Sequence, residues 1–280
     1  MRLFYRLFGG RTAKVMEQPQ RARISLPAQD YAAIYALSDI HGCHDALLEA
    51  EKRIVEDASA IPGRKLLMFL GDYVDRGPRS SDVLQHLCEP PPSGFDRYAL
   101  LGNHDDVFLK FLDDPRANRD WLEYGSGPTL ASYGIDVDYL LGQEGRSLEE
   151  LGEAARRAIP PAHVKLLRSL PVAVTVGSTI FVHAGIQPNI SLAGQTDDDL
   201  IWIREPFLSQ GPQLPVLVVH GHTPSTRPTF GNGRIGIDTA VSMGGTLTVL
   251  KIVDGHGAPF PSQQPKRSKV LQRSVHVNRR

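Results

Sequence analysis

Five short clusters of aspartate, histidine and asparagine, each beside a glycine, hold the residues whose types and spacing could do chemistry. In chain order they are Asp39-Ile40-His41-Gly42, Gly71-Asp72-Tyr73-Val74-Asp75-Arg76-Gly77, Gly102-Asn103-His104-Asp105, His183-Ala184-Gly185 and His220-Gly221-His222-Thr223. Carboxylate, imidazole and amide groups without cysteine form the mixed ligand set that suits Mn, Fe or Zn ions. A carboxylate shared by two such ions gives a two-metal site for displacement at phosphorus. The clusters therefore predict a metal-assisted reaction of a phosphate group.

Each cluster comes directly after a short apolar run that predicts a buried strand. The first three runs cover 34–37, 65–70 and 98–101, and helical patterns over about 45–58 and 80–87 separate them. Alternating strands and helices predict a parallel or mixed sheet covered by helices. Because ligands of such sheets bind at the carboxyl ends of the strands, we expect the clusters to meet there.

The second half of the sequence is richer in strands. Short apolar runs with close glycine turns occur in VAVTV, TIFVHAG, PVLVVHGH, RIGIDT and GTLTVLKIV. They predict a second sheet that packs on the first. The expected fold class is therefore α/β, with two packed mixed β-sheets flanked by helices in a single domain. Residues 121–162 have helical and loop-like composition, and their pattern does not place them in this scheme.

The charge of the chain is unevenly distributed. It has 31 basic and 31 acidic residues, but twelve basic residues and only one acidic residue lie outside 24–255, which leaves 19 against 30 and a net charge of −11 for that body. A body this acidic disfavours a nucleic-acid groove, so no nucleic-acid partner is expected. We expect a flexible basic N-terminal segment over 1–30, a catalytic domain over 31–255 and a flexible basic C-terminal tail over 256–280.

The cysteine content and the N-terminal sequence indicate a compartment. Two cysteines, Cys43 and Cys88, exclude a disulfide framework and are typical of a reducing compartment. The N-terminal stretch lacks an apolar run long enough for a signal sequence. No stretch approaches the roughly 18 apolar residues of a membrane span. These features predict a cytoplasmic protein without stable membrane insertion.

Taken as a set, the strings DIHG, GDYVDRG, GNHD, VHAG and GHT resemble the calcineurin-like metallophosphoesterases. The set looks like the phosphoprotein-phosphatase branch in its bacterial and phage form, and GDYVDRG is highly specific to that branch. The resemblance covers about 34–253, which is nearly everything except the ends. It implies the metallophosphoesterase β-sandwich fold and two divalent metal ions, with Mn favoured and Fe or Zn as alternatives. It also implies that the two metals activate a hydroxide that attacks phosphorus.

The resemblance assigns roles residue by residue. The implied ligands of the first metal are Asp39, His41 and the bridging Asp72, and those of the second are Asp72, Asn103, His183 and His222. His104 would be the general acid, held by Asp75, while Arg76 and Arg204 would bind phosphate. For Arg204 the alternative is a surface ion pair with Glu205. The Gly125-Ser126-Gly127 segment is expected to border the active site.

Three questions stay open on the sequence alone. His220 either joins the site or ends its strand. Asp105 stands where eukaryotic relatives have glutamate, which would alter any contact it makes to an arginine. The main functional hypothesis is a serine/threonine protein phosphatase acting on phosphorylated proteins. The alternative is a symmetrical diadenosine-tetraphosphate hydrolase acting on a dinucleoside polyphosphate, and a remote alternative is an inactive scaffold. A nucleotide would need an aromatic or arginine platform for adenine, for which the aromatic candidates are Trp121, Tyr124, Tyr133 and Trp202. Core packing is an equally good interpretation of these four residues.

Overall fold

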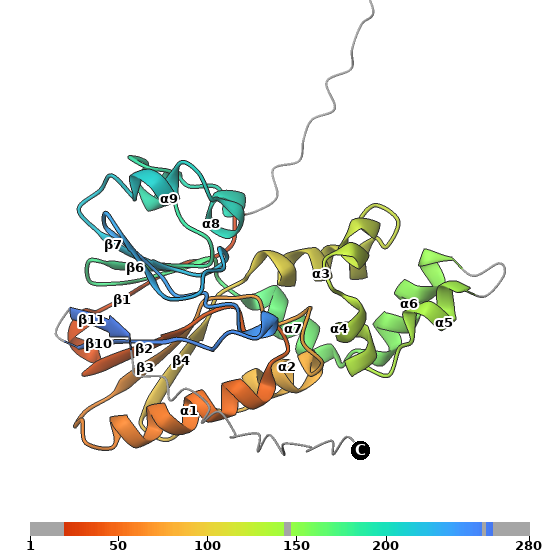
Figure 1. Ribbon diagram of the computed structural model, residues 1–280, viewed down its shortest axis with the longest axis horizontal. Helices are drawn as coiled ribbons and strands as arrows, with labels where there is room; N and C mark the ends of the chain where they lie inside the picture. Colours follow the sequence, from red (N-terminus) through yellow and green to blue (C-terminus); the bar gives the residue numbers. More distant parts are fainter. Residues whose placement is uncertain (1–19, 143–146, 254–255, 260–280) are drawn as a thin grey trace, which may run out of the picture.

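Two β-sheets stacked face to face form the centre of the molecule, with helices on their outer sides (Figure 1). The computed structural model describes residues 20–142, 147–253 and 256–259. The flexible ends expected from the sequence lie for the most part outside these residues, over 1–19 and 260–280. Both sheets contain parallel and antiparallel pairs, which confirms the expected α/β class with two mixed sheets.

The first sheet carries the strands that lead to the first three clusters. Its order is β11-β10-β2-β3-β4. β2, β3 and β4 run parallel, whereas β10 pairs antiparallel with both β2 and β11. The strands are β2 (Ala33–Leu37), β3 (Lys65–Phe69), β4 (Phe95–Ala99), β10 (Val249–Val253) and β11 (His256–Pro259). Three parallel strands therefore end at the same edge of this sheet.

The second sheet has the order β1-β5-β6-β7-β9-β8. Its hairpins β5–β6 and β8–β9 are antiparallel, while β6, β7 and β9 run parallel. The strands are β1 (Arg23–Leu26), β5 (Ala173–Val176), β6 (Thr179–Val182), β7 (Leu217–His220), β8 (Thr229–Gly231) and β9 (Arg234–Gly236). β6 and β7 deliver the last two clusters at their carboxyl ends.

The central strands are apolar throughout because both of their faces are buried. Along β2, Ile34 and Ala36 belong to the core between the sheets, whereas Tyr35 and Leu37 belong to the core beneath the helices. Successive side chains of a strand point to opposite faces, so the alternation follows from strand geometry. Continuous apolar runs are the sequence pattern of such doubly covered strands.

Helices cover the outer faces of the two sheets and form a helical region beside them (Figure 1). They are α1 (His44–Ala58), α2 (Ser80–Cys88), α3 (Asn103–Asp113), α4 (Gly127–Ser132), α5 (Val137–Gly142), α6 (Leu148–Ala158), α7 (Pro161–Ser169), α8 (Asp197–Trp202) and α9 (Phe207–Gln210), with the 3₁₀ turns η1 (Ala28–Asp30), η2 (Arg119–Glu123), η3 (Leu192–Gly194) and η4 (Val241–Met243). The middle that the sequence did not place is thus mainly helical, and α5 and α6 lie farthest from the sheets (Figure 1). Among the described helices, none combines the length and apolar composition that crossing a membrane requires.

The sheets extend beyond both expected boundaries of the catalytic domain. β1 pairs in parallel with β5, so the folded domain begins before residue 31. β11 pairs with β10, so it continues past residue 255. The third strand also differs, because β4 starts at Phe95 in register with Lys65 of β3 and ends at Ala99. Short edge strands gain their stability from pairing with a neighbour, and their own composition signals them weakly.

Candidate metal centre

The five clusters lie together at the carboxyl ends of strands from both sheets, and residues of three of them line one pocket. His41 follows β2, Asp72 follows β3, His183 follows β6 and His222 follows β7, while Asn103 begins α3 after β4. The pocket has a volume of about 520 Å³. It is lined by Asp72, Arg76, Asn103, His104, Glu123, Tyr124, Gly125, Trp202, Arg204 and His222. Strands of both sheets thus bring the clusters together at their carboxyl ends.

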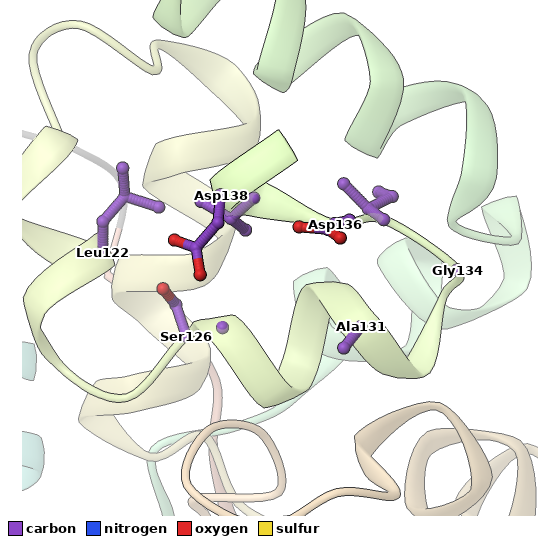
Figure 2. Close-up of a pocket in the computed structure, with 9 residues that line it drawn as sticks. Leu122, Ser126, Ala131, Gly134, Asp136 and Asp138 are labelled. Carbon is purple, nitrogen blue, oxygen red and sulfur yellow. The ribbon is translucent and has the colours of Figure 1, made fainter. Parts of the chain in front are cut away.

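A second cavity of about 460 Å³ lies on the other side of the Gly125-Ser126-Gly127 segment. Gly125 lines the first pocket, and its carbonyl accepts a hydrogen bond from the backbone N–H of Arg76 at 2.8 Å. Ser126 and Gly127 line the second cavity, together with Asp136 and Asp138 (Figure 2). The carboxylate of Asp136 accepts the backbone N–H of Tyr139 at 2.9 Å, a local cap at the start of α5. The second cavity has no histidine in its lining.

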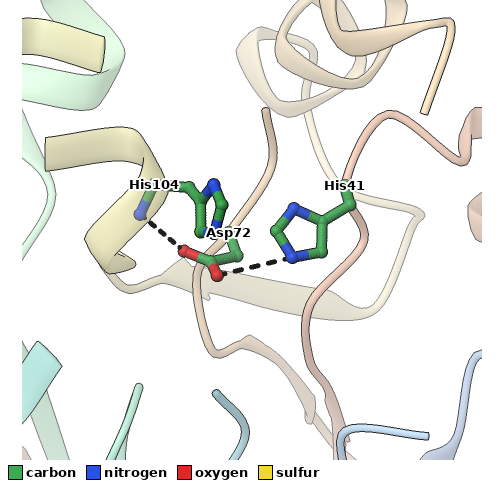
Figure 3. A group of neighbouring side chains, drawn as sticks. All are labelled: His41, Asp72 and His104. Atoms are coloured by element: carbon green, nitrogen blue, oxygen red, sulfur yellow. Dashed lines mark hydrogen bonds and ion pairs between the residues drawn. The ribbon is translucent and has the colours of Figure 1, made fainter. Parts of the chain in front are cut away.

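Asp72 belongs to two groups of side chains that are spaced closely enough to hold a metal ion. One group is His41, Asp72 and His104, and the other is Asp72, His183 and His222. Within each group the ligand atoms lie within 4.8 Å of one another. Figure 3 shows the Asp72 carboxylate between His41 and the backbone N–H of His104, with Oδ2 at 3.5 Å from His41 Nε2 and Oδ1 at 3.0 Å from that N–H. A single carboxylate shared by two groups is the arrangement that a two-metal site requires.

The imidazole rings are fixed in the tautomer that metal binding needs. Nδ1 of His41 lies 2.8 Å from the carbonyl oxygen of Val74, and Nδ1 of His183 lies 2.8 Å from that of Leu70. A carbonyl only accepts hydrogen bonds, so both Nδ1 atoms carry a proton, and each Nε2 atom offers a lone pair whenever its ring is neutral. Those Nε2 atoms lie 3.5 and 3.4 Å from Oδ2 of Asp72.

The protonation of these histidines follows from burial and from Asp72. Burial lowers the pKa of His41 and of His222 to about 3, so both rings are neutral. Burial also lowers the pKa of His183, but the charge of Asp72 and the hydrogen bond to it outweigh this and raise the pKa to about 9. Neutral imidazole is the form that ligates metal. A cation beside Asp72 would take the place of the His183 proton.

Asn103 and Asp39 complete the ligand set that the family resemblance implies, in different ways. The amide oxygen of Asn103 lies 2.9 Å from Nε2 of His183 and 2.9 Å from Nδ1 of His222. Asp39 is in neither metal-sized group of the described residues; its carboxylate accepts the hydroxyl of Ser38 and the backbone N–H of His222. The oxygen and nitrogen donors gathered around Asp72 fit two divalent cations of the Mn, Fe or Zn type.

His104 and Asp75 form a buried dyad beside this centre. Nδ1 of His104 lies 2.7 Å from Oδ2 of Asp75. The Asp75 carboxylate also accepts the indole N–H of Trp121 at 3.0 Å and the hydroxyl of Thr129 at 3.1 Å. The sequence assigned neither residue to Asp75, although Thr129 comes shortly after the Gly125-Ser126-Gly127 segment expected to border the site. The result is a ring whose Nε2 faces the pocket and whose orientation is set by three elements of the chain.

The two arginines expected to bind phosphate both line the pocket. Nη1 of Arg76 donates to Nε2 of His41 at 2.8 Å, and Nη2 lies 3.0 Å from Nε2 of His104. Arg204 is an exposed side chain that follows α8. Among the described ion pairs there is none between Arg204 and Glu205, and the Glu205 carboxylate instead accepts the hydroxyl of Ser209 at 2.6 Å. The surface-pair alternative for Arg204 therefore receives no support.

The backbone at the site adopts conformations that cost energy. Nine described residues other than glycine have a positive φ, and six of them are predicted site residues: Asp39, His41, Asp72, Asp75, Arg76 and His222. Each such residue costs about 1–3 kcal/mol and tends to occur where function requires it. Glycine permits the close packing, because a Cβ on Gly102 would lie 2.2 Å from the backbone nitrogen of Asp72. The strand ends are therefore shaped around the side chains that they present.

Asp105 has a role that the sequence did not reveal. Its carboxylate accepts the backbone N–H groups of Asp72, Tyr73 and Gly102 at 2.9, 2.9 and 3.0 Å. The sequence left open a contact between Asp105 and an arginine, but in the structure the Asp105 carboxylate accepts these backbone hydrogen bonds. Asp105 thus holds the loop that carries Asp72. Its place directly after the Asn103-His104 pair was the one available signal.

The other open residues separate into core and pocket positions. His220 is buried against Phe207, with ring centroids 5.1 Å apart, and belongs to neither metal-sized group of the described chain. Trp121 is fully buried, and Tyr133, whose hydroxyl lies 2.8 Å from Nδ1 of His163, does not line the pocket. Of the four aromatic candidates for an adenine platform, Tyr124 and Trp202 line the pocket.

Removing the metal ions is expected to make the stability of this protein fall with rising pH. In the metal-free state His183 has its pKa raised from 6.5 to about 9. The native state then holds a proton that the unfolded chain has released, so stability is lost between about pH 6.5 and 9. Burial, and secondarily the charge of a neighbouring carboxylate, also raises the pKa of Asp39 and Asp105, which acts in the same direction.

The check is the thermal midpoint of chelator-treated and Mn²⁺-loaded protein at pH 6.5 and pH 9. The lowered pKa values of His41 and His222 affect stability only below about pH 6.5, so they do not alter this window. Between pH 6.5 and pH 9 the thermal midpoint of the stripped protein should fall further than that of the loaded protein, because bound cations take the place of the His183 proton. A stripped protein whose midpoint rises or stays level over this range would contradict the electrostatic account.

Comparison with known proteins places the chain in a family. A profile of the calcineurin-like phosphoesterase family matches residues 32–250. The asymmetrical bis(5'-nucleosyl)-tetraphosphatase PrpE of Bacillus velezensis is 25% identical over 250 residues, which covers 82% of this chain and 92% of the relative.

Solved structures show the same fold at low identity. One that is provisionally described as a diadenosine tetraphosphatase has a TM-score of 0.57 at 22% identity and covers 88% of this chain and 100% of its own. A serine/threonine phosphatase from Saccharomyces cerevisiae has a TM-score of 0.53 at 16% identity, with coverage of 88% and 86%. With a shared carboxylate at the strand ends and a family profile that spans most of the sequence, this chain belongs to the calcineurin-like phosphoesterase family.

Proposed function

We propose that this protein hydrolyses dinucleoside tetraphosphates asymmetrically, to a nucleoside triphosphate and a nucleoside monophosphate, with the help of two bound cations. The substrate assignment rests on the similarity to relatives named asymmetrical bis(5'-nucleosyl)-tetraphosphatase, such as the one from Bacillus velezensis, over 82% of this chain. The sequence-based alternative of a dinucleotide hydrolase is thus better supported than the main hypothesis of a protein phosphatase. The relatives' name also favours an asymmetrical cut over the symmetrical one.

The residues around Asp72 would hold the cations. Asp39, His41 and Asp72 are proposed for the first, and Asp72 would bridge to the second. The remaining ligands of the second would be Asn103, His183 and His222. Two bound divalent ions, which we propose to be Mn²⁺, supply a water nucleophile at neutral pH and neutralise charge on the phosphate oxygens. The chain's own part is to present buried donors in the correct tautomer, as the carbonyls behind His41 and His183 do.

His104 is proposed as the general acid for the leaving oxygen. Burial lowers its pKa, but the charge of Asp72 and the hydrogen bond and charge of Asp75 outweigh this and raise the pKa above its ordinary value. When cations offset Asp72, the hydrogen bond to Asp75 is the contact that still favours the proton on the ring. Arg76 and Arg204 present guanidinium groups to the same pocket and are proposed to bind phosphate oxygens.

The substrate assignment is tested by comparing kcat/KM of the Mn²⁺-loaded protein on diadenosine tetraphosphate and on a phosphothreonine peptide. The proposal predicts that the dinucleotide is the better substrate by at least about tenfold, which corresponds to about 1.4 kcal/mol of transition-state binding. A preference for the peptide would restore the protein-phosphatase hypothesis. Inactivity on both substrates with two ions bound would contradict the proposed substrate class.

A further inference from the structure

Two aromatic residues, Tyr124 and Trp202, line the pocket at the proposed metal centre. Tyr124 lies beside His104, with ring centroids 6.1 Å apart, and Trp202 lies beside His222, with centroids 6.2 Å apart. Tyr124 is 44% exposed and Trp202 is 39% exposed, whereas most large aromatic side chains of the described residues are buried. Both rings therefore have a face available to a ligand in a pocket whose floor is the proposed metal site.

Both rings are held on well-anchored segments from distant parts of the chain. Tyr124 directly follows η2, and its backbone N–H donates to the carbonyl of Trp121 at 3.0 Å. The indole of Trp121 in turn donates to the Asp75 carboxylate. Trp202 ends α8, which begins with a capping box at Thr196. Arg23 of β1 bonds Asp197 in the first turn of that helix at 2.9 Å. Fixed aromatic platforms bind a planar ring at low entropic cost.

The charges around the pocket distinguish a base-binding end from the phosphate-binding centre. Arg76 and Arg204 would attract phosphate oxygens, but Glu123, next to Tyr124, would repel them. A carboxylate there suits the hydroxyl and amino donors of a nucleoside. We infer that Tyr124 and Trp202 are the base-stacking residues of this pocket and hold the nucleoside next to the scissile phosphate. This inference rests on the proposed function and specifies its substrate contacts.

The position of the rings agrees with cleavage beside a nucleoside. Each ring lies next to a histidine of the centre, so a base stacked on it is close to the reacting phosphorus. In a dinucleoside tetraphosphate, one phosphate separates a nucleoside from the bridge nearest to it, whereas two separate it from the central bridge. Water then adds across the nearest P–O–P bridge, which breaks to give one monophosphate and one triphosphate, and no oxidant or further reactant is needed.

The test uses the Mn²⁺-loaded full chain and the variants Tyr124→Leu and Trp202→Leu. Each is expected to raise KM for diadenosine tetraphosphate about tenfold, the order of one lost base–aromatic stack. The inhibition constant of tripolyphosphate, which has phosphates and no base, should stay at the wild-type value. Phenylalanine at either position should restore most of the binding. Phe230→Leu is the matched control, because Phe230 is 62% exposed and outside the pocket.

A second readout does not depend on turnover. The chain has two tryptophans, and Trp121 is buried, so AMP stacking should quench the Trp202 emission and leave that of Trp121. Trp202→Phe should abolish the quench. If the wild-type protein hydrolyses the dinucleotide and both leucine variants keep the wild-type KM, the stacking role of Tyr124 and Trp202 is refuted and the proposed function is not. An equal loss of affinity for tripolyphosphate in those variants would also refute the stacking role. If the wild-type protein does not hydrolyse the dinucleotide at all, both the proposed function and the stacking role are refuted.

Discussion

Asp72→Asn is expected to remove both metal ions together and to lower kcat/KM by at least about 10³-fold. The amide keeps the size of the side chain but removes the charge that both metal-sized groups share. Bound cations contribute several kcal/mol to the stabilisation of charge at phosphorus, and each 1.4 kcal/mol is a factor of ten in rate. The measurement is the metal content per chain after gel filtration, together with kcat/KM on diadenosine tetraphosphate.

Asp57→Asn provides the control for loss of a partly buried carboxylate elsewhere. Asp57 lies on α1, outside the pocket, and pairs with Lys251 at 2.6 Å. This variant should keep two ions and full activity. Retention of a complete metal pair by Asp72→Asn would contradict the bridging role, whatever happened to the rate. Circular dichroism of both variants checks that the fold is unchanged.

His104→Ala is expected to lower kcat by about 10²–10⁴-fold on a substrate with a poor leaving group while metal content stays at two ions per chain. The dependence on leaving group follows from the proposed role. Phenol, like tyrosine, has a pKa near 10 and needs a proton as it departs, whereas p-nitrophenol departs readily as an anion. The variant should therefore lose much more activity on phenyl phosphate than on p-nitrophenyl phosphate.

Asp75→Asn tests the effect of Asp75 on the proposed general acid His104. The hydrogen bond and charge of Asp75 raise the pKa of His104, so the amide should shift the alkaline limb of the kcat/KM profile to lower pH. The acid is active below that pKa and is lost as pH rises through it, so the variant should lose activity first at high pH. Equal losses on both aryl phosphates for His104→Ala would contradict the acid assignment. An alkaline limb that does not move in Asp75→Asn would contradict the dyad.

Much of the fold could be predicted because the central strands are buried on both faces. The runs that lead to His41, Asp72 and His183 are continuous in apolar residues, and strand ends beside glycine are distinct in the sequence. β1 and β11 could not be predicted in this way, since their pairing with β5 and β10 is a tertiary contact. The helical middle could not be placed because its helices pack on one another and on α2 and α3, and these tertiary contacts are not encoded in the pattern of any single helix.

The motif residues of the site come together as the sequence predicted, but their supports could not be foreseen. Nothing in the sequence links Thr129 or Trp121 to Asp75, because the link exists only once α4 and η2 pack beside the second cluster. Asp105 stood inside a motif, yet its three bonds to backbone N–H groups depend on the meeting of two loops. Residues that contact a ligand are recurrent in type and spacing, whereas residues that hold them depend on the particular packing.

The products formed from diadenosine tetraphosphate by the Mn²⁺-loaded protein test the central claim most directly. Chromatography of an early time point should show AMP and ATP in equal amounts, which requires attack at the bridge beside one nucleoside. Two molecules of ADP per substrate would instead mean a symmetrical cut and would contradict both the proposed reaction and the place of Tyr124 and Trp202 beside the scissile phosphate.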